Sequence, residues 1–246
     1  MPLLEEFERS GNWLFRWRSY LPLGMILLIA LVLLDYQPFL QRSDFDTYWK
    51  LFCFGIGLLG LGIRVYTIGH TPRGTSGRNT AGQRAAEVNT TGIYSTVRHP
   101  LYLGNYVMGL GLALVPHQWW LVAIYSLIFW VYYERIMVAE EEFLRKKFGA
   151  AYEEWGNRTP AFIPSFKHWQ PPALPFSARN VLKREYSGFF ALILSMYILV
   201  FISDFAIAGK PTVNWLWIGI TIFGFLVWFT LRTLKKKTRI LHVEGR

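Results

Sequence analysis

The sequence predicts an all-α integral membrane protein, a polytopic bundle of about six transmembrane helices. Hydrophobic residues make up 52% of the 246 residues, and they are concentrated in long runs. A helix needs about 20 mostly apolar residues to cross a bilayer. The runs that reach or approach that length are Tyr20–Tyr36, Tyr48–Ile68, Leu101–Val115, Trp119–Ala139, Tyr186–Ala208 and Val213–Leu231.

These runs belong to a single membrane domain, which we expect to cover residues 1–246. The first two runs predict a transmembrane hairpin over residues 20–69, and the last two predict another over residues 186–231. The third run is short, and only Pro116–Gln118 separates it from the fourth. Because proline marks a turn, we expect these two helices to form a tight hairpin.

The net charge of +10 is unevenly distributed along the chain. With six spans, both termini lie on the same side of the membrane. The segments on that side are 1–19, 70–100, 134–185 and 232–246, and they hold 22 of the 26 Lys and Arg residues. The positive-inside rule therefore predicts that both termini are cytoplasmic. The positive charge is explained by topology, so we expect no nucleic acid as a partner.

Cys53 is the single cysteine, and it falls inside the second apolar run. One cysteine allows neither an intrachain disulfide nor a cysteine-based metal cluster. Its side chain is small enough to serve helix packing, and we expect no bound metal.

The fourth apolar run continues into a charged segment without losing its helical pattern. Glu140, Leu144 and Phe148 recur every four residues. This spacing predicts that the helix leaves the membrane and continues as an amphipathic helix. Gly149 or Gly156 is expected to end it, since glycine is favoured just after a helix.

Arg98, His99 and Pro100 precede the third apolar run. Proline is well placed as the first residue of a helix, where its missing N–H costs nothing. The free N–H groups and the dipole at a helix start favour an anion. Two basic side chains there predict a site for a carboxylate or phosphate at the membrane surface. The simpler alternative is that Arg98 reaches lipid phosphates.

The helix after this start has a bare surface at Gly104, Gly109 and Gly111. Such glycines allow either close packing of helices in the bilayer or room for a flat ligand. Gly104 lies four residues after Pro100, so its bare surface is near the charged start of the helix.

Charged residues of both signs are expected to meet at the cytoplasmic end of this hairpin. Arg135 and the acidic pair Glu140 and Glu141 lie near the end of the fourth run. In a hairpin they approach Arg98 and His99. Ionisable groups at that depth usually face a cavity and pair with one another. The sequence therefore predicts a site for a ligand that carries both charge signs.

S-adenosylmethionine is a ligand of this kind, with a carboxylate, an ammonium, a sulfonium and an adenine ring. Aromatic rings attract such cations through their faces. The aromatic candidates for holding the sulfonium are Tyr94, Tyr102, Tyr106 and Tyr133.

Two motifs together resemble the isoprenylcysteine carboxyl methyltransferase and phospholipid methyltransferase superfamily. The first is Gly-x-Tyr-x-x-x-Arg-His-Pro-x-Tyr-x-Gly, from Gly92 to Gly104. The second is Glu-Glu-x-x-Leu-x-x-x-Phe-Gly-x-x-Tyr, followed by a basic residue and two prolines. It runs from Glu140 to Pro164, with Trp155 where the family often has a second tyrosine. Residues 92–164 are thus identified as a methyltransferase core.

The resemblance implies an enzyme that binds S-adenosylmethionine at the cytoplasmic face and methylates a lipid-borne group. The residues that it implies for binding the cofactor are Tyr94, His99, Pro100, Tyr102, Gly104, Asn105, Glu140 and Glu141. The residues that it places nearest the transferred methyl group are Arg98, Arg135 and Glu140.

The acceptor is expected to be anionic, because Arg73, Arg78 and Asn79 lie in a loop rich in Gly, Ser and Thr beside the site. The chain is similar to bacterial members of the superfamily that are proposed to methylate the 1-phosphate of lipid A. That similarity implies a lipid substrate and a bacterial inner membrane. The alternatives are an isoprenylcysteine carboxylate and a phospholipid amine. Only the amine would need a base, for which Glu140 and His99 are the candidates.

Two other classes of protein share some of these sequence features. Membrane sterol or steroid reductases that use a nicotinamide cofactor also carry Arg-His-Pro, usually followed by Asn-Tyr-x-Gly-Glu. This chain has Leu101 and Asn105 in place of that Asn and Glu. A transporter or scaffold would be expected to show matched broken helices in two halves, and the sequence has no such internal symmetry.

Overall fold

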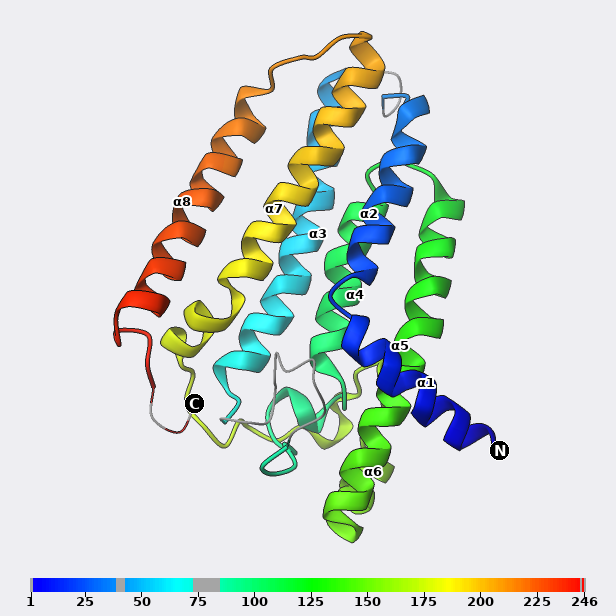
Figure 1. The fold of residues 1–246 in the computed structure, drawn as a ribbon, viewed down its shortest axis with the longest axis vertical. Helices are drawn as coiled ribbons and strands as arrows, with labels where there is room; N and C mark the ends of the chain where they lie inside the picture. The colour runs from blue at the N-terminus through cyan, green and yellow to red at the C-terminus, as the bar shows by residue number, and fades with distance from the viewer. Residues whose placement is uncertain (1, 39–42, 73–84, 244, 246) are drawn as a thin grey trace.

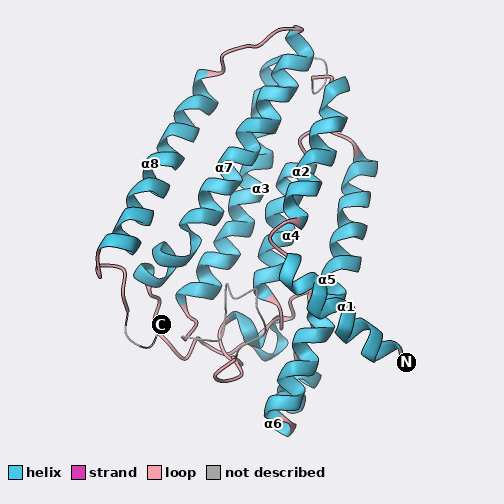
Figure 2. Ribbon diagram, in the orientation of Figure 1, coloured by secondary structure: helices cyan, strands magenta, loops and turns pink. Residues whose placement is uncertain are grey.

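The computed structural model describes residues 2–38, 43–72, 85–243 and 245. These residues form helices and loops, with no strand among them (Figure 2). The α-helices are α1 (Leu3–Trp17), α2 (Leu21–Val32), α3 (Ser43–Gly69), α4 (Pro100–Ala113), α5 (Trp119–Phe148), α6 (Ala150–Arg158), α7 (Ala178–Ala208) and α8 (Trp215–Lys237). Short 3-10 helices are η1 (Leu33–Asp35), η3 (Ile93–Ser95) and η4 (Phe166–His168).

Each of the predicted apolar runs lies in a helix, and the prediction of a polytopic membrane bundle is confirmed. Four helices are long and apolar enough to cross a membrane, namely α3 from Phe45, α5, α7 and α8. A shorter apolar helix extends from Leu23 to Asp35, and α4 has 14 residues. The predicted number of six spans includes these two shorter helices.

The helices α2, α3, α4, α5, α7 and α8 run side by side along the long axis of the molecule (Figure 1). Both termini lie at one end of the bundle, which we call the terminal end. The helices α1 and α6 lie at the same end (Figure 1). The α4–α5 and α7–α8 connections lie at the opposite end. This arrangement brings the start of α4 and the charged half of α5 to the terminal end, as the hairpin prediction requires.

The helix α5 continues past its apolar part to Phe148, as the four-residue period predicts. It ends at Gly149, which has a φ of 54°. Glycine adopts this left-handed backbone conformation at little cost, so the chain can turn there into α6.

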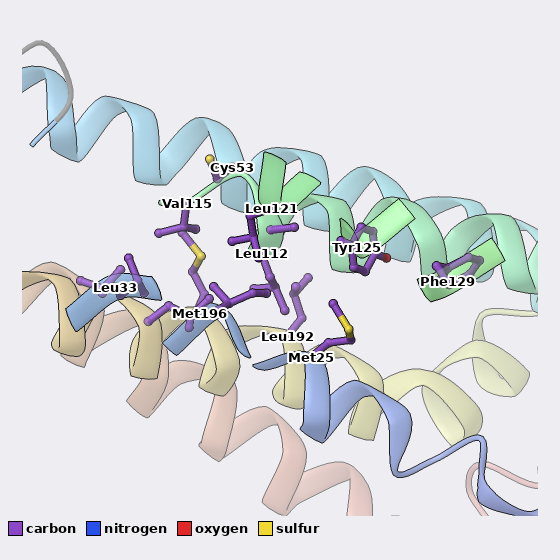
Figure 3. Close-up of a cluster of buried hydrophobic side chains, with 14 of the residues drawn as sticks. Met25, Leu33, Cys53, Leu112, Val115, Leu121, Tyr125, Phe129, Leu192 and Met196 are labelled. Atoms are coloured by element: carbon purple, nitrogen blue, oxygen red, sulfur yellow. The ribbon is translucent and has the colours of Figure 1, made fainter. Parts of the chain in front are cut away.

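The apolar core joins α2, α3, α4, α5 and α7, as Figure 3 shows. Cys53 is fully buried within it and serves packing, as its size predicts. Other buried members of this cluster are Met25, Leu33, Leu112, Val115, Leu121, Tyr125, Phe129, Leu192 and Met196.

Glycines bring the backbones of α3 and α4 into contact. A Cβ atom added to Gly60 would lie 2.4 Å from the backbone nitrogen of Met108. One added to Gly111 would lie 2.5 Å from the carbonyl oxygen of Cys53. Lipid tails are as apolar as leucine side chains, so helices in a bilayer associate through close packing of this kind.

A buried ion-pair cluster joins α3 and α7 at the opposite end of the bundle. The Lys50 ammonium lies 2.7 Å from Asp46 Oδ2 and 2.8 Å from Asp204 Oδ1. The Lys50 side chain is only 2% exposed. The Asn214 amide donates to the second oxygen of Asp204 at 3.0 Å, which connects the start of α8 to the cluster. These contacts fix three helices at the end remote from the methyltransferase motifs.

Replacing Lys50 by methionine is expected to lower the free energy of unfolding by about 3–5 kcal/mol, because it leaves buried carboxylates without their cation. The measurement is unfolding of the purified protein by denaturing detergent. Lys210→Ala is the matched control, since Lys210 is an exposed residue of the nearby α7–α8 loop. Equal stability of the two variants would contradict a stabilising role for the Lys50 cluster.

Candidate active site

The start of α4 is held by backbone hydrogen bonds to the segment that follows α6. His99 precedes the helix with φ −120° and ψ 60°, and Pro100 is its first residue. The backbone N–H of Arg98 donates to the carbonyl of Pro160 at 2.9 Å, and that of His99 donates to Ala161 at 3.2 Å. The two sequence motifs, which lie some distance apart in the chain, are therefore in direct contact.

Glu141 of α5 faces the start of α4 and binds both of its basic residues. One carboxylate oxygen lies 2.9 Å from His99 Nε2, and the other lies 3.2 Å from Arg98 Nη1. The His99 side chain is 5% exposed and the Glu141 side chain 18% exposed. Glu141 thus uses both of its oxygens to hold the Arg-His pair in place.

Glu140 has a different environment from its neighbour. The Tyr102 hydroxyl donates to Glu140 Oε2 at 2.8 Å, and His99 Nδ1 lies 3.7 Å from the same oxygen. The Glu140 side chain is 33% exposed, nearly twice the value for Glu141. Glu140 is therefore the carboxylate of the pair that a ligand can approach.

Arg98 keeps one unused hydrogen-bond donor in this cluster. Its Nε atom is buried and has no hydrogen-bond partner among the residues that the structure describes. A buried donor without a partner costs about 1–3 kcal/mol. Binding of an acceptor group such as a carboxylate or phosphate oxygen would remove this cost.

Aromatic rings line one side of the cluster. The rings of His99 and Tyr102 are stacked, with centroids 5.5 Å apart and an interplanar angle of 13°. Tyr133 of α5 packs against Tyr102 at 4.9 Å. Tyr106 instead bonds to Ser126 at 2.9 Å and packs against Tyr125 and so points away from the charged groups. Of the predicted aromatic cation holders, Tyr102 and Tyr133 are in place and Tyr106 is not.

Tyr94 lies between the cluster and a neighbouring cavity. Burial and the negative charge of Glu140 raise the pKa of Tyr94, so its hydroxyl stays protonated at neutral pH. The adjoining cavity has a volume of about 220 Å³. Its lining includes Thr67, His70, Glu87, Asn89, Tyr94 and Leu174. This cavity gives room beside the charged cluster for part of a ligand.

Arg64 connects the cluster to two other helices, and the sequence motifs gave no hint of its partner. Its Nε and Nη2 atoms donate to the two oxygens of Glu185 at 2.7 and 2.8 Å. Its Nη1 atom donates to Asn105 Oδ1 at 2.7 Å. The Asn105 amide in turn donates to the Tyr133 hydroxyl at 3.3 Å. Asn105 is one of the residues predicted to bind the cofactor. In the structure its side-chain amide connects Arg64 to Tyr133 through these two hydrogen bonds.

Gly104 faces α3 and lies away from the open side of the cluster. A Cβ atom added to it would lie 2.6 Å from Arg64 Cγ and 2.8 Å from the carbonyl oxygen of Gly60. Of the two functions considered for this glycine, close helix packing is the one that the structure supports.

Arg135 does not join the other charged residues, although the hairpin places it at the same end. Its guanidinium donates to the Ser10 hydroxyl at 3.1 Å and lies 4.7 Å from the centre of the Phe7 ring. Both partners belong to α1, which packs on the side of α5 that carries Arg135. The predicted convergence of five residues is thus correct for four of them.

The predicted acceptor residues Arg73, Arg78 and Asn79 lie outside the described part of the chain. Among the described residues, no group of three or more His, Cys, Asp or Glu side chains is arranged to hold a metal ion.

Arg64→Met is expected to lower the free energy of unfolding by about 3–5 kcal/mol, because it leaves Glu185 charged and buried without its cation. Glu185 is only 3% exposed. The double variant Arg64→Met/Glu185→Met is expected to regain most of this loss, since an apolar pair carries no desolvation cost. Denaturant unfolding of both variants measures the coupling. A double variant that is less stable than Arg64→Met would contradict the pairing.

A family model for phospholipid methyltransferases matches residues 47–151 of this chain. The match begins in α3, upstream of the predicted core, and therefore includes Arg64 as well as Arg98, Glu140 and Glu141. No solved structure matches the chain significantly.

Three relatives are similar over parts of their length. The nickel-cobalt-cadmium resistance protein NccN of Alcaligenes xylosoxydans xylosoxydans is 31% identical over 60% of this chain and 62% of that protein. Protein-S-isoprenylcysteine O-methyltransferase of Schizosaccharomyces pombe is 33% identical over 30% of this chain and 32% of that protein. The cobalt-zinc-cadmium resistance protein CzcN of Cupriavidus metallidurans is 34% identical over 34% of this chain and 38% of that protein.

The matched segments span less than two thirds of each of these relatives. The family-model match includes the first motif, from Gly92 to Gly104, and the start of the second, from Glu140 to Ala151. The resemblance of this chain to the isoprenylcysteine carboxyl methyltransferase and phospholipid methyltransferase superfamily is therefore confirmed, with residues 47–151 as the matched region.

Proposed function

We propose that this integral membrane protein transfers a methyl group from S-adenosylmethionine to an anionic, lipid-borne acceptor. The observation that carries the proposal is the cluster of Arg98, His99 and Glu140, which lies where membrane helices reach the terminal end of the bundle. Groups of both charge signs meet there beside aromatic rings, within the region that the phospholipid methyltransferase family model matches.

The residues of the cluster fit the charged groups of S-adenosylmethionine. The unpartnered Nε atom of Arg98 suits a carboxylate. The accessible carboxylate of Glu140 suits an ammonium or a hydroxyl group. The buried rings of Tyr102 and Tyr133 pack against each other beside these groups and give this side of the cluster an aromatic wall. When bound, S-adenosylmethionine supplies an electrophilic methyl group, which forms a bond to the acceptor oxygen as the carbon–sulfur bond breaks and the electron pair stays on sulfur.

The protein's own contribution is alignment in a site with little water. Glu141 fixes Arg98 and His99, so the guanidinium keeps one orientation. Holding the two reactants in line removes much of the entropic part of the barrier. Exclusion of water strengthens each charge interaction inside the site.

An anionic acceptor fits this arrangement because it needs no base. The hydrogen bond between His99 Nε2 and Glu141 suits His99 to positioning the start of α4. An oxygen of a phosphate or carboxylate arrives already ionised and can attack directly. The basic segments of the chain, which gather at the terminal end, favour the same charge.

A lipid phosphate headgroup, such as the 1-phosphate of lipid A, is the acceptor that we propose first. This choice also assigns the terminal end to the cytoplasmic side of a bacterial inner membrane, in line with the positive-inside rule. An isoprenylcysteine carboxylate is the second candidate, because several relatives are named as enzymes that methylate it. A phospholipid amine would need Glu140 or His99 as a base.

Arg98→Ala and Glu140→Gln are each expected to reduce methyl transfer by about 100-fold or more, the usual effect of removing one charged group from a polar active site. The measurement is transfer of labelled methyl from S-adenosylmethionine into membrane lipid extract, with the lipids separated by headgroup and identified by mass spectrometry. Lys210→Ala, at the opposite end of the bundle, is the matched control and is expected to keep full activity.

A thermal melt with S-adenosylhomocysteine tests cofactor binding separately from the identity of the methyl acceptor. The measured quantity is the rise in melting temperature. A stabilised wild-type protein that labels only a prenylcysteine analogue would favour the second acceptor. A protein that is neither stabilised nor active on any of these acceptors would contradict methyl transfer. Stabilisation by NADPH instead would favour a reductase.

A further inference from the structure

The helix α1 has three distinct faces, and each has a different environment. Gly11 and Phe15 are buried. A Cβ atom added to Gly11 would lie 2.0 Å from the carbonyl oxygen of Arg135, so the backbones of α1 and α5 touch. The Tyr132 hydroxyl also donates to the Leu14 carbonyl at 2.9 Å. This face fixes α1 firmly on α5.

The second face carries Trp13 and Trp17, and Tyr20, in the turn that follows the helix, continues it into an exposed aromatic ridge. Their exposed fractions are 59%, 49% and 60%. The rings of Trp13 and Trp17 lie 6.0 Å apart, and those of Trp17 and Tyr20 lie 5.4 Å apart. Three large aromatic side chains in a continuous row are thus left uncovered by the described residues.

The third face is polar. Residues Arg9, Asn12 and Arg16 are exposed. They follow one another at spacings of three and four, which places them on one side of a helix. A helix with one apolar and one strongly polar exposed face is typical of segments that lie in the plane of a membrane surface.

The aromatic ridge continues the surface that the bundle presents to lipid. The chain passes directly from α1 into the apolar helix α2, whose Leu23, Leu27 and Leu31 are 62%, 62% and 56% exposed. Figure 1 shows α1 crossing α5 at the terminal end, at an angle to the membrane-spanning helices. Tryptophan and tyrosine concentrate at this level of a membrane, where an apolar ring and a polar tip are both satisfied.

We propose that α1 lies in the plane of the membrane surface, with the aromatic ridge inserted at the level of the phospholipid headgroups and Asn12 facing water. The partner of this surface is the phospholipid interface. Through the contact of Arg135 with Ser10, the same helix holds the charged half of α5 at a fixed depth. This inference does not depend on the reaction that the protein catalyses.

The test uses single cysteines that carry an environment-sensitive fluorophore, in a Cys53→Ala background. Trp13→Cys reports on the ridge, and Asn12→Cys is the matched control one residue away on the polar face. The labelled proteins are placed in vesicles of phosphatidylcholine and phosphatidylglycerol. We expect the probe at position 13 to emit at shorter wavelength and to be quenched by lipids with a headgroup-level nitroxide. We expect the probe at position 12 to be quenched by iodide instead.

Trp17→Cys provides a second ridge position in case the first variant does not fold. Equal quenching by iodide at positions 12, 13 and 17 would show that α1 lies in water and would overturn the proposal. Protection of the ridge probes from both quenchers would overturn it as well, because a second copy of the chain or another protein would then cover the ridge.

Discussion

The ion pair between Arg64 and Glu185 is the interaction on which the geometry of the terminal end depends. A charged side chain among apolar helices is costly unless it is paired. Here the Nε and Nη2 atoms of Arg64 each donate to one oxygen of the Glu185 carboxylate. The pair joins α3 to α7. Because the third nitrogen, Nη1, donates to Asn105, α4 is tied to the same point. Three helices thus meet at one guanidinium, and each of its three nitrogens donates a hydrogen bond.

This connection has a direct consequence for the candidate site. Asn105 lies on the first turns of α4, the helix that begins with Arg98, His99 and Pro100 in front of it. Its amide donates to Tyr133, whose ring packs against Tyr102, and Tyr102 donates to Glu140. A continuous series of contacts therefore connects the Arg64–Glu185 pair to the carboxylate that a ligand can approach. Glycine packing between α3 and α4 makes the connection stiff, since neither backbone can move closer to the other.

Much of the fold could be predicted from the sequence because hydropathy and helix-ending signals are local. The apolar runs lie in helices, and α5 ends at Gly149, one of the two glycines predicted to end it. The meeting of Arg98 and His99 with Glu141 could also be predicted, since a tight hairpin leaves little choice of where its charged ends lie.

The directions of individual side chains could not be predicted in the same way. Arg135 turns toward α1 because α1 is a helix that covers that side of α5. The apolar residues of α1 recur with a helical period, but this period does not say which helix α1 packs against. Gly104 packs on α3 because Gly60 lies opposite, a pairing between residues far apart in the chain. Glu185 and Arg64 are 121 positions apart in the sequence, and a local sequence pattern cannot predict that two such residues pair.

The two neighbouring carboxylates show how one short motif can serve two purposes. Successive residues of an α-helix point about 100° apart, so Glu140 and Glu141 cannot face the same partner equally. Both oxygens of Glu141 are used by Arg98 and His99, which stabilises the charge of Arg98 near the start of α4, where the helix dipole disfavours cations. Glu140 is held by a single hydroxyl donor and remains partly exposed. Glu141 therefore holds the site together, and Glu140 is the carboxylate that is left for a ligand. Neither residue can take the role of the other from its own position on the helix.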